Sequence, residues 1–215
     1  MNGSYYQNKS VNYGIAKTRK RKILELVGEI KESRILDIGC ATGYLGAEIK
    51  NNGNHVAGIE ISKQAAEEAE KVLDKVYVFD LQNNWPPEIQ NDKYDLAILA
   101  EVLEHVFDPA QVLKNIYNTL GENGEIVITT PNILAWPNRI KFLLGQFKYT
   151  DQGTFDFGHI RFFTYDYLKK VLSESGFDLI KENHIIFPGK LTKVLKYWPG
   201  LFANQFIIKA KKSIL

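Results

Sequence analysis

The stretch Ile35-Leu36-Asp37-Ile38-Gly39-Cys40-Ala41-Thr42-Gly43-Tyr44-Leu45-Gly46 decides the fold of this 215-residue chain. A run of strand-favouring residues ends around an acid, and glycines spaced Gly-xxx-Gly-xx-Gly then lead into a helical pattern. Glycines permit a tight turn in which the backbone comes close to a ligand at the helix N-terminus. The stretch therefore predicts a strand, a ligand-binding turn and a helix in succession.

The acid in this turn indicates which ligand it binds. A dinucleotide-binding turn places a pyrophosphate at the helix N-terminus, where the carboxylate of Asp37 would repel it. The dinucleotide pattern G-x-G-x-x-G is also absent, because Ala41 stands where its second glycine would be. S-adenosylmethionine carries an ammonium group, a sulfonium and a ribose but no phosphate, and it suits this turn better.

The composition is that of an ordinary globular protein, with 45% hydrophobic and 24% charged residues. The formal net charge of +2 gives no support for a nucleic-acid partner. The single cysteine excludes an internal disulfide and is compatible with a reducing cytosol. No apolar stretch resembles a signal peptide or is long enough to span a bilayer, so we expect one cytoplasmic domain over residues 1–215.

Strand and helix patterns alternate along the first two thirds of the chain. We expect strands at residues 34–39, 54–60, 75–80, 94–100 and 124–130, and helices at 14–31, 43–51, 62–73, 86–90 and 108–120. Apolar strands separated by helices favour a parallel sheet covered on both faces. A helix from Thr164 to about Gly176 and an antiparallel edge pair, 177–187 and 204–211, complete the pattern.

Two further acids stand at the ends of expected strands. Glu60 ends the second strand and Asp80 ends the third, at the edge where open α/β sheets bind their ligands. A carboxylate can accept hydrogen bonds from both hydroxyls of a ribose, although each acid alone could instead cap a helix or a turn. With the glycine turn and this order of strands, the chain resembles the class I S-adenosylmethionine-dependent methyltransferases.

The resemblance implies a Rossmann-like, doubly wound α/β fold in a single domain. Its sheet would have seven mainly parallel strands, the last of them antiparallel. By the same resemblance Glu60 holds the ribose and Asp80 the adenine amino group, whereas Asp95 is structural. The expected cofactor-binding residues are Asp37, Gly39, Cys40, Ala41, Gly43, Glu60, Ile61, Asp80, Leu81, Ala100 and Glu101.

Later motifs narrow the resemblance. They are Glu101-Val102-Leu103-Glu104-His105-Val106, Thr129-Thr130-Pro131-Asn132 and His159-Ile160-Arg161-Phe162-Phe163-Thr164. This series is similar to a subgroup that contains ubiquinone-biosynthesis O-methyltransferases and bacterial enzymes that methylate surface polysaccharides. The implied acceptor is a hydroxyl oxygen of a small molecule or glycan precursor. A quinone-ring or RNA ribose O-methyltransferase is an alternative, and a non-catalytic S-adenosylmethionine-binding protein is another.

His105 and His159 are the expected catalytic residues. A hydroxyl acceptor must lose a proton during methyl transfer, and a neutral imidazole can accept it, although either histidine could instead be structural. Glu101, Glu104 and His105 would share one face of a helix. In similar RNA 3′-end methyltransferases such a cluster, with a distant histidine, binds a divalent metal. We expect no metal here, because clusters without cysteine are weak metal signals.

Two aromatic segments remain. The stretch 132–160 follows the fifth strand, and we expect it to cap the acceptor. The lysine-rich loop 188–203 either packs on the core with snorkelling lysines, which we favour, or makes peripheral contact with lipid headgroups. We expect no obligate protein partner. Nucleic acid is disfavoured, since Trp85-Pro86-Pro87 precedes the fourth strand, whereas the similar loop of DNA aminomethylases follows it.

Overall fold

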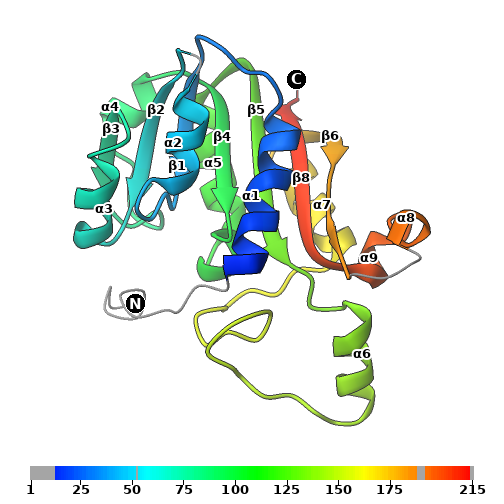
Figure 1. Ribbon diagram of the computed structural model, residues 1–215. Coiled ribbons are helices and arrows are strands. Elements are labelled where there is room, and N and C mark those ends of the chain that lie inside the picture. Colours follow the sequence, from blue (N-terminus) through cyan, green and yellow to red (C-terminus); the bar gives the residue numbers. More distant parts are fainter. Residues whose placement is uncertain (1–12, 52, 188–191, 214–215) are drawn as a thin grey trace.

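The computed structural model describes residues 13–51, 53–187 and 192–213, and these form an α/β fold around one sheet (Figure 1). The polar N-terminus and Lys190 of the loop discussed above lie outside the described residues. The strands are β1 (Arg34–Ile38), β2 (His55–Glu60), β3 (Lys75–Val78), β4 (Tyr94–Ala100), β5 (Leu120–Pro131), β6 (Phe177–Glu182), β7 (Ile185–Ile186) and β8 (Ala203–Lys212). The helices are α1 (Tyr13–Val27), α2 (Tyr44–Lys50), α3 (Lys63–Ala69), α4 (Pro87–Asn91), α5 (Pro109–Thr119), α6 (Trp136–Leu143), α7 (Tyr165–Glu174), α8 (Thr192–Leu195) and α9 (Pro199–Phe202).

The sheet has the order β3-β2-β1-β4-β5-β8-β6. The short strand β7 also pairs with β8, antiparallel to it. Neighbours from β3 to β5 pair in parallel, whereas β8 is antiparallel to both β5 and β6. The predicted doubly wound, mainly parallel sheet with an antiparallel last strand is therefore confirmed. The strand expected at 177–187 is divided into β6 and β7, which makes the described sheet eight-stranded. The last strand lies inside the sheet, and β6 forms its edge.

Helices cover both faces of the sheet because each presents an apolar stripe to it. On one face, Ile23, Leu26 and Val27 of α1 join Ile49 of α2 and Ala69 of α3 in a buried cluster. On the other face, the buried cluster contains residues of α4, α5 and α7: Ile89, Val112, Leu113, Ile116, Leu168, Val171 and Leu172. The carboxyl ends of β1 to β5 all lie at one edge of the sheet, the edge nearest α6 in Figure 1.

Side-chain caps fix where several helices begin. Asp108 accepts a hydrogen bond from the backbone N–H of Gln111 at 3.0 Å, and Thr164 accepts one from Tyr167 at 3.2 Å. These are the starts that the sequence predicted for α5 and α7. Helix α1 ends earlier than expected, at Val27, because Gly28 adopts a positive φ of 72°.

Residues 132–160 project beyond the carboxyl edge of the sheet and contain α6 (Figure 1). An aromatic cluster holds the projecting segment together, since the rings of Phe142, Phe147 and Phe155 lie 5.2 to 6.2 Å apart. Strand pairing within this segment is limited to isolated bridges such as Thr150 with Asp156. Across the residues described, no helix is both long and apolar enough to cross a membrane.

Candidate functional site

A cavity of about 670 Å³ opens at the carboxyl ends of β1, β2 and β4. Eight of the eleven expected cofactor-binding residues line it: Gly39, Ala41, Glu60, Ile61, Asp80, Leu81, Ala100 and Glu101. His105 lines it as well. Asp37, Cys40 and Gly43 do not reach the wall of the cavity, and neither does His159. The strand ends thus gather most of the predicted residues around one space.

The glycine turn is held to the end of β2 by backbone hydrogen bonds. The N–H groups of Gly39 and Cys40 both donate to the carbonyl oxygen of Ile59, at 2.8 and 3.0 Å. Gly39 has a φ of 69°, and a Cβ there would lie 2.6 Å from Cγ2 of Val102. Ala41 also has a positive φ, of 48°, which costs an alanine roughly 1 kcal/mol. The turn therefore holds its backbone against the cavity at some conformational cost.

Asp37 lies beneath the turn. Its Oδ2 accepts a hydrogen bond from the N–H of Gly46 at 3.1 Å, so that it joins β1 to α2. Burial raises the pKa of this carboxyl to about 7, and the negative charge of Glu60 adds to the shift. Burial likewise raises the pKa of the Cys40 thiol, which keeps it protonated and unreactive. Both residues are buried on the side of the turn that faces away from the cavity, so their contribution is to its structure.

Glu60 connects the glycine turn to the segment that precedes α3. Its Oε2 accepts from the N–H of Ala41 at 3.0 Å, and its Oε1 accepts from the N–H of Ser62 at 2.8 Å. Each carboxylate oxygen keeps a second lone pair for a ligand. Asp80, the other predicted acid, accepts from the N–H of Gln82 at 2.9 Å in the turn after β3. Asp95 instead accepts from the N–H of Arg34 at 2.8 Å, which confirms its structural role.

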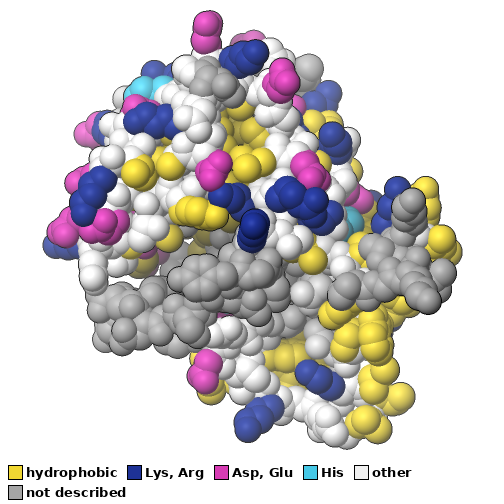
Figure 2. Space-filling view, viewed as in Figure 1, with side chains coloured by type: hydrophobic (Ala, Val, Ile, Leu, Met, Phe, Trp, Pro, Cys, Tyr) yellow, Lys and Arg dark blue, Asp and Glu magenta, His cyan; other side chains and the backbone are white. Residues whose placement is uncertain are grey.

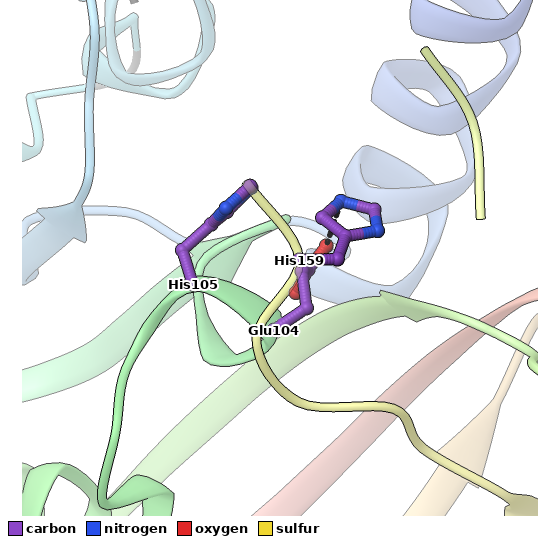
Figure 3. A group of neighbouring side chains, drawn as sticks. All are labelled: Glu104, His105 and His159. Atoms are coloured by element: carbon purple, nitrogen blue, oxygen red, sulfur yellow. Dashed lines mark ion pairs between the residues drawn. The ribbon is translucent and has the colours of Figure 1, made fainter. Parts of the chain in front are cut away.

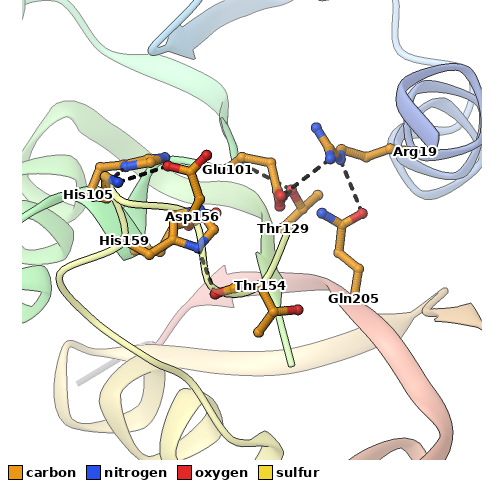
Figure 4. A network of polar contacts seen from close by, with 10 residues as sticks. Arg19, Glu101, His105, Thr129, Thr154, Asp156, His159 and Gln205 are labelled. Carbon is orange, nitrogen blue, oxygen red and sulfur yellow. Dashed lines mark hydrogen bonds and ion pairs between the residues drawn. The ribbon is translucent and has the colours of Figure 1, made fainter. Parts of the chain in front are cut away.

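Glu101 takes part in a polar network that reaches α1 (Figure 4). One oxygen of its carboxylate lies 3.2 Å from Nη2 of Arg19, and the other accepts from the hydroxyl of Thr129 at 2.9 Å. The Nε of Arg19 donates in turn to Oε1 of Gln205 at 3.0 Å. Glu101 has a φ of 62°, and Leu103–His105 is a single 3₁₀ turn. The three residues of the Glu-xx-Glu-His motif therefore do not share a helix face.

Glu104 is the most deeply buried acid of the motif, with 1% of its surface exposed. Neither oxygen of its carboxylate has a hydrogen-bond partner among the described residues. The nearby hydroxyl of Thr130 favours the charged form weakly, but it does not reach normal hydrogen-bond geometry. Burial, reinforced by the charge of Glu101, raises the pKa of Glu104 well above its usual range. Burial and the charge of Glu101 thus both disfavour the charged form of Glu104.

The two histidines lie against each other beside Glu104 (Figure 3). Their ring centroids are 4.8 Å apart, and Nε2 of His159 lies 4.0 Å from Oε1 of Glu104. Nδ1 of His159 is 3.0 Å from the carbonyl oxygen of Thr154, and Nδ1 of His105 is 2.8 Å from that of Gly158. A carbonyl only accepts, so the proton of neutral His159 stays on Nδ1 and the lone pair of Nε2 faces Glu104.

These three side chains also form a possible metal site. The ligand atoms of Glu104, His105 and His159 all lie within 4.8 Å of one another. One carboxylate and two imidazoles suit a transition metal such as manganese or zinc. Glu101, the fourth residue of the motif-based cluster, instead forms the ion pair with Arg19.

Several residues of this site were not predicted from the sequence. Arg19 belongs to a basic cluster whose ordinary interpretation is a solvated surface, yet it reaches Glu101. Asp156 is buried, and its Oδ1 accepts from the N–H of Gly158 at 2.8 Å, beside both histidines in Figure 4. An acid between two phenylalanines, as in Phe155-Asp156-Phe157, was the one local indication of burial. For Arg19 no local pattern could indicate a partner so distant in the chain.

Comparisons with known proteins identify the family to which the chain belongs. A family model described as a methyltransferase domain matches residues 12–182. The ubiquinone biosynthesis O-methyltransferase of Aeromonas salmonicida is 34% identical over 114 residues, which are 51% of this chain and 48% of that protein. Its counterpart from Bradyrhizobium diazoefficiens is 27% identical over 159 residues, or 72% and 62% of the two chains. The chain thus spans about half the length of the curated relatives it matches.

Solved structures share the fold. A methyltransferase of Archaeoglobus fulgidus that depends on S-adenosylmethionine matches 93% of this chain and 94% of its own, with a TM-score of 0.68 and 21% identity. Magnesium protoporphyrin IX methyltransferase of Synechocystis, solved with bound S-adenosylhomocysteine, matches 98% and 92% with a TM-score of 0.66 and 18% identity. With the family model covering most of its length, the chain belongs to the methyltransferase-domain family, and it shares the fold of these S-adenosylmethionine-dependent methyltransferases.

Proposed function

We propose that this protein transfers the methyl group of S-adenosylmethionine to a hydroxyl oxygen of a small molecule or glycan precursor. One observation carries the proposal: His105 lines the cofactor cavity and packs against His159, with the buried acid Glu104 behind them. Methylation of a hydroxyl requires a proton acceptor at the reacting oxygen, and an imidazole at the cavity wall can supply it. The partial likeness to ubiquinone biosynthesis O-methyltransferases supports the same chemistry.

Different residues of the cavity would contact different parts of the cofactor. The second lone pairs of Glu60 would accept hydrogen bonds from the ribose hydroxyls, and Asp80 would accept from the adenine amino group. Gly39 and Ala41 would bring the backbone close to the ligand, and Asp37 would hold the turn in place through its hydrogen bond from Gly46. Methyl transfer is an in-line displacement from sulfur, so that fixing the donor methyl against the acceptor oxygen contributes much of the catalysis.

His105 is the proposed base, and His159 keeps it in position. His105 borders the cavity, whereas His159 is buried and held by the carbonyl of Thr154. Residues 132–160 supply His159 and would cover the acceptor. A proton taken up by His105 would be stabilised by the polar groups behind it, including Asp156.

A metal-assisted version is the second candidate. The unpartnered carboxylate of Glu104 and the convergence of three ligand atoms favour it. A divalent cation held there by Glu104, His105 and His159 would lower the pKa of an acceptor hydroxyl and make it a better nucleophile. We favour the metal-free version, because a neutral imidazole near the acceptor hydroxyl already supplies a proton acceptor.

The function can be tested with simple acceptors. Catechol and 3,4-dihydroxybenzoate serve as hydroxyl probes, aniline and thiophenol serve as amine and thiol controls, and mass spectrometry locates the added methyl group. We expect methylation on oxygen. Methylation of only the amine or the thiol would contradict the proposal. Tight binding of S-adenosylmethionine with no transfer to any acceptor would support the non-catalytic binding protein.

The roles of the histidines are tested on the same assay. We expect His105→Gln to lower kcat by about 10²- to 10⁴-fold while the affinity for S-adenosylhomocysteine changes little. Activity should survive EDTA if no metal takes part. Loss of activity with EDTA and its return with Mn²⁺ or Co²⁺ would establish the metal-assisted version instead. Full activity of both His105→Gln and His159→Gln would remove the histidines from the mechanism.

A further inference from the structure

Helix α6 turns its apolar side to solvent. Trp136, Ile140, Leu143 and Leu144 follow the i, i+4, i+7, i+8 spacing and lie on one side of the helix. They are 42%, 48%, 87% and 65% exposed, respectively. The opposite side carries Asn138, which is buried. This is the reverse of an ordinary surface helix, whose apolar stripe faces the core.

The exposed apolar surface continues from α6 to α8. Val194 of α8 is exposed, as are Tyr197 and Trp198 just after it, at 72% and 58%. The ring of Trp136 lies 6.1 Å from that of Phe187, and Arg139 donates to the carbonyl oxygen of Gly200 at 3.4 Å. Figure 2 shows hydrophobic side chains gathered over α6 and at α8. We call this the apolar patch: Trp136, Ile140, Leu143, Leu144, Val194, Tyr197 and Trp198.

The charges around the apolar patch are mostly positive. Arg139, Lys141, Lys148 and Lys196 are exposed within residues 132–160 and 194–202. Asp151 is the exposed acid in the same two ranges, since Asp156 is buried. Aromatic and aliphatic side chains with basic neighbours suit the boundary between lipid chains and anionic headgroups. Lysine stems cover apolar surface while their ammonium groups reach the phosphates.

We propose that the apolar patch seats this protein on the surface of an anionic lipid bilayer, with α6 lying among the headgroups. A second copy of the chain fits less well, because two patches face to face would bring their basic rims together. The core packing expected for loop 188–203 does not extend to Val194, Tyr197 and Trp198, which are exposed. The same segment that carries α6 also carries His159. If the proposed function holds, the acceptor hydroxyl would therefore belong to a molecule anchored by a lipid tail.

The test uses the full chain and vesicles of defined composition. We expect it to sediment with phosphatidylglycerol vesicles, less with phosphatidylcholine vesicles, and less with either at high salt. Leu143→Glu/Leu144→Glu should weaken binding to phosphatidylglycerol vesicles by about ten- to a hundredfold. The variant lacks two leucine side chains that would be buried in the bilayer, and it adds negative charge that the anionic headgroups repel. Leu179→Glu/Ile180→Glu is the matched control: two neighbouring, exposed residues of β6, outside the patch. It should bind as the parent does.

Other outcomes overturn the proposal. Equal binding of the parent and the α6 variant, or no binding of the parent to any vesicle, would do so. A parent that is dimeric without lipid and an α6 variant that is monomeric would assign the patch to a second copy. Binding of S-adenosylhomocysteine, measured by calorimetry, is independent of the patch. If the chain binds vesicles but not S-adenosylhomocysteine, the membrane-binding role of the apolar patch is supported and the proposed function is wrong.

Discussion

Glu60 uses both of its carboxylate oxygens on the protein itself before any ligand arrives. They accept from the N–H groups of Ala41 and Ser62, and so connect the glycine turn to the start of α3. A ligand that uses the remaining lone pairs therefore meets a carboxylate whose orientation is already fixed. Preorganisation of this kind reduces the ordering cost of binding.

We expect Glu60→Ala to weaken the binding of S-adenosylhomocysteine by about ten- to a hundredfold. Hydrogen bonds to a charged acceptor contribute roughly 1.5–3 kcal/mol, and the loosened turn adds to the loss. Calorimetry on the folded variant measures the change. Glu67→Ala, an exposed acid of α3, is the control and should bind normally. A folded Glu60→Ala variant with the parent's affinity would show that Glu60 serves only to hold the turn.

Asp37 makes stability depend on pH. Its pKa is about 7 in the folded protein against 3.8 for the ordinary carboxyl, so the folded state keeps a proton that the unfolded state has lost between these values. Stability from this group is full below pH 4 and is lost as the pH rises through 7. Asp37→Asn keeps an oxygen to accept from Gly46 and does not titrate.

We therefore expect Asp37→Asn to gain stability over the parent between pH 4 and pH 7, by up to about 4 kcal/mol above pH 7. Urea unfolding at pH 4, 6 and 8 measures the difference. A difference that does not change with pH would mean that the charge of Asp37 is balanced by another group in the folded protein.

Among the elements, α1 contacts both the site and the segment between β6 and β7. Arg19 forms the ion pair with Glu101 at the cavity, and Lys22 donates to Oδ1 of Asn183 at 2.7 Å, one turn further along. Ile23, next to Lys22 in the helix, is buried against the sheet. The helix thus links the cavity wall to the segment between β6 and β7.

We expect Arg19→Met to raise the KM for S-adenosylmethionine several-fold and to speed hydrogen exchange in the first half of α1. The partly buried ion pair and its hydrogen bonds contribute about 1–2 kcal/mol. Lys22→Met removes the contact of α1 with Asn183, which does not line the cavity, and should leave KM unchanged. If both variants raise KM equally, α1 acts on the cavity through its general stability and not through Glu101.

Elements with strong local patterns were predictable from the sequence. The caps at Asp108 and Thr164 fix α5 and α7, and the apolar runs of β1, β2 and β4 lie where they were expected. The Glu-xx-Glu-His segment was not predictable in the same way. Helical spacing suggested one shared face, but Glu101 adopts a positive φ that is held by Thr129 and Arg19, both distant in sequence. Long-range contacts override local periodicity at this strand end.

For the whole molecule, the layered sheet followed from the alternation of strands and helices, and so did the edge at which the cavity forms. The orientation of α6 did not follow, because an apolar stripe on a helix looks the same in sequence whether it faces the core or the solvent. The position of β8 inside the sheet was also beyond local pattern. Its buried residues, such as Phe206 and Ile208, pack as a central strand requires, but an apolar strand does not reveal its neighbours.

The interior position of β8 has a consequence for synthesis. A ribosome makes β6 before β8, yet β6 pairs with no strand of the described sheet other than β8. Until Ala203–Lys212 has left the exit tunnel, β6 cannot join the sheet, and β5 keeps one unpaired edge. We expect nascent chains stalled with β7 outside the tunnel and β8 still inside it to be cleaved by protease within 177–187, whereas the released chain resists. The strands from β3 to β5 could assemble earlier, so the unfinished protein would carry a formed cofactor cavity beside an open sheet edge that a chaperone must protect.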